Sequence, residues 1–147
     1  ERMMKLQRIE IIYDFPQPVE KIFAWLGDHN NLSHIFAPFN VKRIKDGQEH
    51  INGVGSVRKL SAFPLLPVEE TVTACQPNQL IEYRVTSKLA PIKEHLGVML
   101  FESYNGGTRL RYTICFTGVV PLLGPVVKVA LQQGIKRGLG KLAKMSL

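Results

Sequence analysis

The sequence predicts an α+β fold, in which one long C-terminal helix covers the concave face of a curved, seven-stranded antiparallel sheet. Three observations support this prediction. Apolar residues alternate with polar ones in residues 6–15 and in six later segments, as in half-buried strands. Turn sequences such as Asp46-Gly47 and Pro77-Asn78 connect the later segments, which favours antiparallel neighbours. After Gly124 the apolar residues recur every three or four positions, as in an amphipathic helix.

The order of elements follows from these patterns and from the prolines between them. The first strand, residues 6–15, ends in a proline-rich turn, and a short helix follows over residues 18–26. A second short helix extends to about Phe36 and ends before Pro38. The later strands are predicted at residues 40–46, 53–60, 68–76, 79–87, 92–103 and 108–119. The long helix then buries a stripe formed by Val127, Leu131, Ile135, Leu139 and Leu142.

Length and composition predict one domain over residues 1–147, because 147 residues with 45% hydrophobic content suit one core. No apolar segment approaches the roughly 20 residues of a membrane span, and the N-terminal residues do not resemble a signal peptide. Two cysteines, Cys75 and Cys115, cannot build a disulfide scaffold or a four-ligand zinc site. We therefore expect a cytoplasmic protein without a metal site or cofactor.

The net charge of +7 is concentrated at the C-terminal end of the chain. No acidic residue follows Glu102, whereas seven basic residues do. Three of them lie opposite the buried stripe of the long helix and could contact an anionic membrane surface or an acidic macromolecule: Arg137, Lys141 and Lys144. The alternative is an ordinary solvated helix face. Few aromatic residues are interleaved with these charges, which argues against a nucleic-acid partner.

A single helix does not fill the concave face of such a sheet, so the sequence also predicts an interior space for a ligand. Alternation along each strand indicates which side chains face that space. Together with the long helix and one loop, these strands predict the ligand-binding residues Arg58, Leu60, Phe63, Glu70, Val72, Tyr83, Val85, His95, Gly97, Met99, Tyr112, Ile114, Phe116, Leu131, Gly134, Ile135 and Gly138.

Glu70 is the unexpected member of this inward set, because an unpaired buried charge costs several kcal/mol. A turn centred on Pro64 would place Arg58 opposite Glu70, and the same row would continue through Val85, His95 and Phe116. Two interpretations remain open. The pair is a structural ion pair, or it presents a polar anchor to a ligand carbonyl, hydroxyl or carboxylate, with His95 as a third polar group.

Glycines and one loop add to the predicted space. Gly97 lies mid-strand on the inner face, and Gly134 and Gly138 border the helix stripe, which indicates either room or close packing there. The loop over residues 61–67 is apolar, so Phe63, Leu65 and Leu66 are expected to close the cavity mouth. The alternative for this loop is packing on the helix end or at a dimer contact.

Several strings resemble the START-like superfamily, also called SRPBCC or polyketide cyclase/dehydrase and lipid transport proteins. They are PVEKIFAWL at residues 18–26, GVGSVR at 53–58, EETV at 69–72, PNQLIEYR at 77–84 and GTRLRY at 107–112. The resemblance covers nearly the whole chain and implies a helix-grip fold. It also implies a hydrophobic ligand such as a lipid, sterol, polyketide, quinone or plant hormone. In the hormone receptors of this fold, an acid matching Glu70 belongs to a water network at the ligand.

The resemblance leaves the activity open, because a minority of the superfamily are enzymes. We expect a binding or carrier protein first. The alternative is an aromatic polyketide cyclase or dehydratase, in which Glu70 and His95, with Arg58, polarise a carbonyl or move a proton. A third interpretation is docking of the basic helix on a membrane, as in coenzyme Q-binding relatives. The ligand and the oligomeric state do not follow from the sequence.

Overall fold

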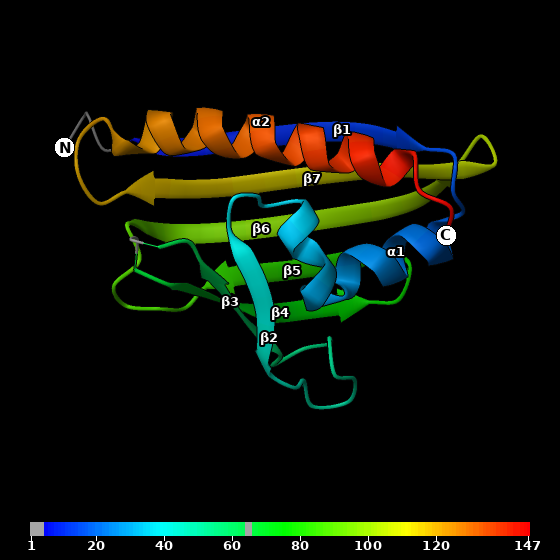
Figure 1. Cartoon of the computed structure of the whole chain (residues 1–147), viewed down its shortest axis with the longest axis horizontal. Helices are drawn as coiled ribbons and strands as arrows, with labels where there is room; N and C mark the ends of the chain where they lie inside the picture. The colour runs from blue at the N-terminus through cyan, green and yellow to red at the C-terminus, as the bar shows by residue number, and fades with distance from the viewer. Residues whose placement is uncertain (1–4, 64–65) are drawn as a thin grey trace.

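The structure is a computed structural model that describes residues 5–63 and 66–147. Its seven strands form one antiparallel sheet in the order β1-β7-β6-β5-β4-β3-β2 (Figure 1). This is the predicted helix-grip fold, and the predicted element order is confirmed. The strands are β1 (Leu6–Phe15), β2 (Asn40–Lys45), β3 (Val57–Ser61), β4 (Val68–Gln76), β5 (Leu80–Val85), β6 (Ile92–Tyr104) and β7 (Gly107–Gly118). The helices are α1 (Val19–Gly27), the 3-10 helix η1 (His29–His34) and α2 (Leu123–Ala143).

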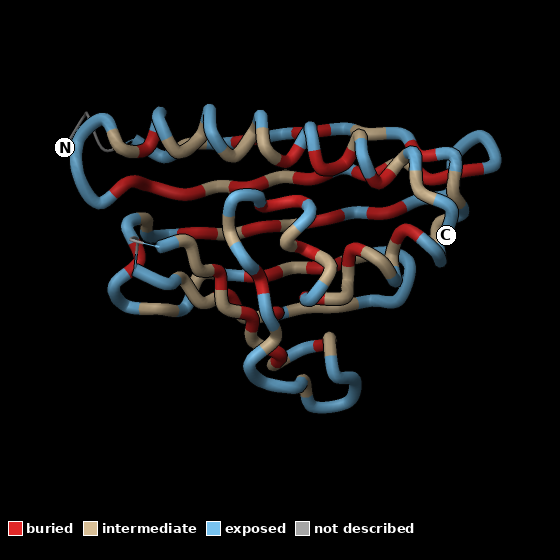
Figure 2. Tube along the Cα trace, in the orientation of Figure 1, coloured by how far each residue is buried: buried red, intermediate tan, exposed pale blue. Residues whose placement is uncertain are grey.

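The helices divide the concave face between them. α2 runs along β1 and β7, α1 contacts β6 and β7, and η1 packs on β2 (Figure 1). Buried residues therefore line the inner faces of β6 and β7, while the outward side of α2 is exposed (Figure 2). No helix among the described residues is both long and apolar enough to cross a membrane.

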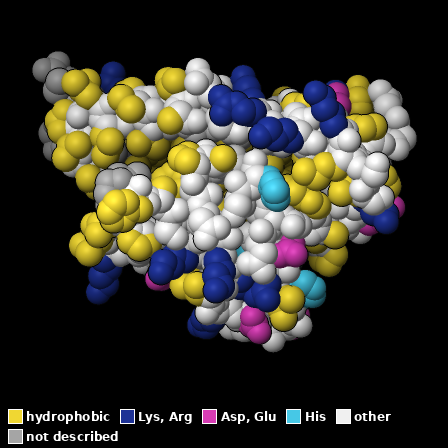
Figure 3. Space-filling model, viewed as in Figure 1, with side chains coloured by type: hydrophobic (Ala, Val, Ile, Leu, Met, Phe, Trp, Pro, Cys, Tyr) yellow, Lys and Arg dark blue, Asp and Glu magenta, His cyan; other side chains and the backbone are white. Residues whose placement is uncertain are grey.

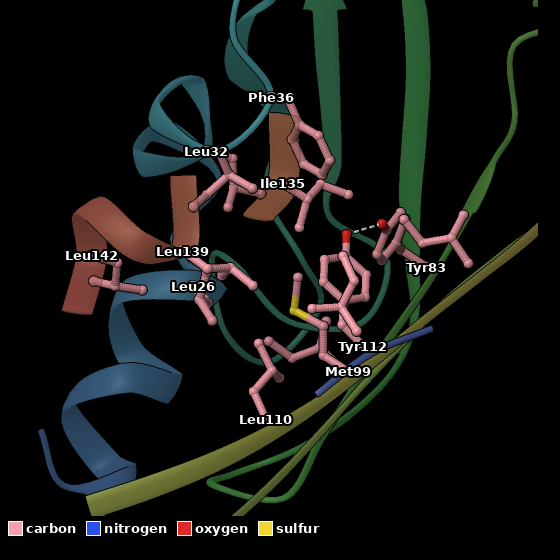
Figure 4. Packing of buried hydrophobic residues seen from close by; sticks show 14 of the residues in the cluster. Leu26, Leu32, Phe36, Tyr83, Met99, Leu110, Tyr112, Ile135, Leu139 and Leu142 are labelled. Atoms are coloured by element: carbon pink, nitrogen blue, oxygen red, sulfur yellow. Dashed lines mark hydrogen bonds between the residues drawn. The ribbon is translucent and has the colours of Figure 1, made fainter. Parts of the chain in front are cut away.

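The buried stripe of α2 is shorter than predicted. Ile135, Leu139 and Leu142 are buried, whereas Val127 and Leu131 are only partly covered. The C-terminal half of the helix packs into a core of side chains from α1, η1 and the sheet, including Leu26, Leu32, Phe36 and Met99 (Figure 4). The N-terminal half borders a gap in this packing, which Leu123, Val126 and Ala130 line from the helix.

Strand β3 begins four residues later than predicted. Residues 51–56 form turns instead, held by hydrogen bonds from the Gly53 N–H to the His50 carbonyl and from the Ser56 N–H to the Gly53 carbonyl. Gly55 adopts φ 89°, a conformation that glycine accepts without steric cost. Local turn geometry thus outweighs the alternating pattern of valines in this segment.

The predicted strand register is correct for most of the sheet. Arg58 pairs with Glu70, and Gly97 pairs with both Tyr83 and Ile114. Glu94 and His95 lie together opposite Phe116, because the ladder between β6 and β7 shifts between Lys93 and Leu96, so the predicted pairing of His95 with Phe116 is part of a bulge and not a regular ladder pair. Glu94 has φ 56° within this bulge. The bulge interrupts the pairing at His95, whose side chain faces the interior as the alternation predicts and is 6% exposed.

Candidate functional site

A pocket of about 410 Å³ lies beneath the N-terminal half of α2. Its walls come from α2, from the segment over residues 35–39, and from β3 to β7. Apolar side chains dominate these walls, and Glu70, Tyr83 and His95 supply the polar atoms. Figure 3 shows hydrophobic side chains gathered along this half of α2 and on the loops that face it. Such a concave, largely apolar space with a few polar groups is typical of small-molecule sites.

The polar wall is centred on the ion pair between β3 and β4. The Arg58 Nε atom donates to Glu70 Oε1 at 2.7 Å, and both side chains are almost fully buried. The Arg58 guanidinium also lies over the Tyr83 ring, 4.3 Å from its centroid. Burial disfavours the charge on Arg58, but the Glu70 carboxylate outweighs this effect, so the pKa of Arg58 lies above its ordinary value.

His29, from η1, holds the other end of Arg58. An Nη1 hydrogen of Arg58 points at His29 Nδ1 over 3.2 Å, and His29 Nε2 lies 2.8 Å from Ser56 Oγ. Because Arg58 can only donate, Nδ1 must accept, and Nε2 carries the proton that is donated to Ser56. Burial, with Arg58 and Arg43 nearby, lowers the pKa of His29 to about 3. His29 is therefore a neutral side chain that holds the Arg58 guanidinium through Nη1, while Glu70 binds it through Nε.

This arrangement predicts a loss of stability in mild acid. The unfolded chain protonates His29 near its ordinary pKa of 6.5, whereas the folded chain does so only near 3. Full stability is therefore present above pH 6.5 and falls as the pH drops toward 3, by about 2 kcal/mol from this group at pH 5. Urea unfolding at pH 7 and pH 5 measures the change. His29→Gln, which keeps a donor and an acceptor, should lose this share of the pH dependence, and an unchanged slope would contradict the assignment.

His95 faces Glu70 from the bulge in β6. Its Nδ1 accepts a hydrogen bond from the Val85 backbone N–H at 3.1 Å, so its proton lies on Nε2. Burial lowers the pKa of His95 although Glu70 opposes this effect, which also favours the neutral ring. His95 Nε2 lies 4.0 Å from Glu70 Oε2, beyond hydrogen-bond distance. The pocket thus contains one aimed donor and one free acceptor atom, side by side.

Tyr83 and Tyr112 close the floor beneath these groups. Their hydroxyls are hydrogen-bonded to each other across β5 and β7, and both rings are buried (Figure 4). Burial raises the pKa of each phenol above its ordinary value, so both stay protonated at neutral pH. Only Tyr83 borders the pocket, and Tyr112 lies below it in the core.

The structure brings about half of the predicted ligand-binding residues around this pocket. Those that line it are Leu60, Glu70, Tyr83, Val85, His95, Ile114, Leu131, Gly134 and Ile135. Those that do not are Arg58, Phe63, Val72, Gly97, Met99, Tyr112, Phe116 and Gly138. Strand alternation selects the inner face of the whole sheet, and most of that face belongs to the closed core rather than to the pocket.

Specific features of the packing explain why three of these residues do not line the pocket. Gly97 leaves no free space, because the Tyr83 ring lies directly over it. Gly138 packs against η1, since a Cβ there would lie 2.7 Å from the Ile35 Cα atom. Phe63 is fully exposed instead of closing a mouth, and Leu66 is 62% exposed. The third residue predicted to close the mouth, Leu65, lies outside the described residues.

Sequence reasoning missed one wall completely. The segment Phe36-Ala37-Pro38-Phe39 was expected only to end a helix, yet all four residues line the pocket opposite Val126 and Ala130 of α2. This connecting segment has a phenylalanine on each side of Ala-Pro and is unusually apolar for a loop. Its composition could have indicated that the segment is buried. Val126 and Ala130 each precede a residue of the predicted buried stripe of the helix. The stripe contained only residues spaced by three or four positions, so these two were not predicted to line the pocket.

A second depression of about 550 Å³ lies on the surface between α1, the turns near residue 50, and the end of β4. Phe23, His50 and Cys75 are among its lining residues. Burial raises the pKa of the Cys75 thiol, so this cysteine is not an activated nucleophile. None of the polar groups described above lies in this depression.

Sequence comparison identifies the family. A family model described as polyketide cyclase / dehydrase and lipid transport matches residues 8–146. The chain belongs to this family. A comparison with curated protein sequences gives no significant match. The family includes both enzymes and lipid carriers by its own description, so the polyketide cyclase/dehydrase and lipid transport assignment leaves the substrate of this member open.

Solved structures share the fold of this family member at low identity. Ara h 8.0201 is 20% identical with a TM-score of 0.67, covering 96% of this chain and 100% of that chain. CV1439 from Chromobacterium violaceum is 16% identical with a TM-score of 0.69, covering 94% and 98% respectively. The Aha1 dimer from Colwellia psychrerythraea is 16% identical with a TM-score of 0.65, covering 93% of each chain. At these identities the likeness shows the fold alone.

Proposed function

We propose that this member of the polyketide cyclase/dehydrase and lipid transport family binds a hydrophobic small molecule in the pocket beneath α2. The observation that carries the proposal is an apolar pocket of about 410 Å³ in which a buried acid and a histidine face the interior from one wall. Filling such a space removes apolar surface of both ligand and protein from water at about 25 cal/mol per Å². This gain, less the cost of ordering, can support micromolar binding without any reaction.

Gly134 offers a direct test, because it lines the pocket from α2 and has room for a side chain. A Cβ at this position would meet only the Ala37 carbonyl oxygen, at 3.8 Å, which is ordinary contact. We expect Gly134→Phe to fill the pocket and to abolish binding of a neutral apolar fluorophore such as Nile red. Folding should persist, since the change also removes a glycine from a helix. Fluorescence titration measures the loss, and urea unfolding measures the stability.

The matched control is Gln133→Phe, which adds the same ring one residue earlier, at an exposed position of α2. We expect the control to bind the fluorophore as the unmodified protein does. Equal binding by Gly134→Phe and the unmodified protein would place the fluorophore elsewhere and would refute the proposed pocket. The surface depression near Cys75 would then be the next site to block.

The basic residues Arg137 and Lys141 are exposed on α2, and Lys144 is exposed directly after it, all at the end of the helix that lies away from the pocket. Their contact with an anionic membrane surface therefore stays a prediction, separate from ligand binding. The apolar side chains that are most exposed near the pocket belong to three loops and the start of α2, and they include Phe63, Leu89 and Leu122.

A further inference from the structure

The gap between Glu70 and His95 has a defined hydrogen-bonding character. Glu70 Oε2 and His95 Nε2 are 4.0 Å apart, and both side chains line the pocket. Among the described residues, Oε2 accepts no hydrogen bond, and Nε2 donates none. Both atoms face the pocket, so a ligand that displaces water from them without pairing them loses hydrogen bonds, and a ligand that pairs both of them gains over one that pairs neither.

The donor and acceptor roles are fixed by contacts outside the pocket. Arg58 Nε donates to the other carboxylate oxygen of Glu70 at 2.7 Å, and a carboxylate paired with a guanidinium in this way can only accept. The Val85 backbone N–H occupies His95 Nδ1 at 3.1 Å, so Nε2 can only donate. Neither role can be exchanged without breaking one of these bonds.

The spacing suits one oxygen atom that bridges the two groups. Hydrogen bonds of about 2.8 Å from a single oxygen to each atom span a separation of 4.0 Å at an angle near 90°. That oxygen must accept from His95 and donate to Glu70 at the same time. A hydroxyl has both a donor hydrogen and free lone pairs, whereas a carbonyl or ether oxygen has only lone pairs.

We propose that the pocket selects hydrophobic ligands that carry an alcohol or phenol hydroxyl at the buried end, held between Glu70 Oε2 and His95 Nε2. This inference rests on the proposed binding function and narrows its ligand class. Of the three groups that the sequence left open for the polar anchor, a carbonyl, a hydroxyl or a carboxylate, the hydroxyl is the one that fits.

Other head groups leave a mismatch. A ligand carboxylate would place a second negative charge beside Glu70, and Arg58 cannot neutralise it because this guanidinium does not line the pocket. A ketone would accept from His95 but would turn a lone pair toward the carboxylate. An ammonium group would pair with Glu70 but would face the His95 N–H without an acceptor.

The test compares ten-carbon probes that share one chain and differ only in the head group: 1-decanol, 2-decanone, 1-methoxynonane, decanoate and decylamine. Each probe displaces Nile red from the unmodified protein, and the competition gives its dissociation constant. We expect 1-decanol to bind about tenfold more tightly than the ketone and the ether, which is the usual scale for one satisfied buried polar pair. Decanoate should bind most weakly.

A variant connects this preference to the two side chains. His95→Phe keeps a ring but removes the Nε2 donor, so the advantage of decanol over the ether should shrink to about twofold. Gln133→Ala, at an exposed position of α2 outside the pocket, should keep the full preference.

The two proposals fail differently. Equal affinities for all head groups, or no effect of His95→Phe on the preference, would overturn the hydroxyl inference while pocket binding stands. Binding of none of the probes and of no Nile red would overturn the proposed function itself. Tighter binding of decanoate than of decanol would also refute the inference, because the site would then carry a free positive charge.

Discussion

Replacing Glu70 with glutamine should lower the free energy of unfolding by about 3–5 kcal/mol, because it leaves the Arg58 charge buried without a partner. Arg58 is 2% exposed, and Glu70 is its only acidic neighbour among the described residues. The other contacts of the guanidinium, with neutral His29 and the Tyr83 ring, do not neutralise it. Urea unfolding at pH 7 measures the loss.

The control is the double variant Arg58→Met with Glu70→Gln. Removing both charges should cost clearly less than the sum of the two single changes, since neither partner is then left uncompensated. Additive losses would mean that Arg58 and Glu70 do not depend on each other. The ion pair would then be incidental to the fold, and its position beside the pocket would carry less weight.

The second large effect is expected at Gly97, where even one methyl group should destabilise the fold by about 3 kcal/mol. An alanine Cβ at this position would overlap the ring of Tyr83, which packs across the strand directly over the glycine. The ring can only yield by moving from Arg58 and from the Tyr112 hydroxyl. Thermal and urea unfolding of Gly97→Ala measure the cost.

Two comparisons make this result specific. Gly134→Ala should be neutral or slightly stabilising, because its Cβ has room and a helix favours alanine over glycine. In a Tyr83→Leu background, Gly97→Ala should cost much less, because the smaller side chain can move aside. If Gly97→Ala lowers the free energy of unfolding as much in the Tyr83→Leu variant as in the unmodified protein, the loss arises from the backbone and not from the Tyr83 ring.

The sequence was sufficient for the fold and for the central ion pair. Alternating strands with short turns admit little besides an antiparallel meander, and turn positions set the register that places Arg58 opposite Glu70. Alternation along each strand put Tyr83 and His95 on the inner side of the sheet. These features depend on local patterns and on neighbouring strands, which is the information that a sequence states most directly.

Only the tertiary structure decided where the space is. The pocket exists because Phe36, Pro38 and Phe39 fold back under α2, a contact between segments about 90 residues apart that no local periodicity encodes. The bulge at Glu94 replaced the regular pairing that was expected between His95 and Phe116, and the Tyr83 ring filled the space that Gly97 was expected to leave. Side chains from several elements fill the same interior. The position of a remaining cavity therefore depends on how all of them pack together, which no single segment of the sequence determines.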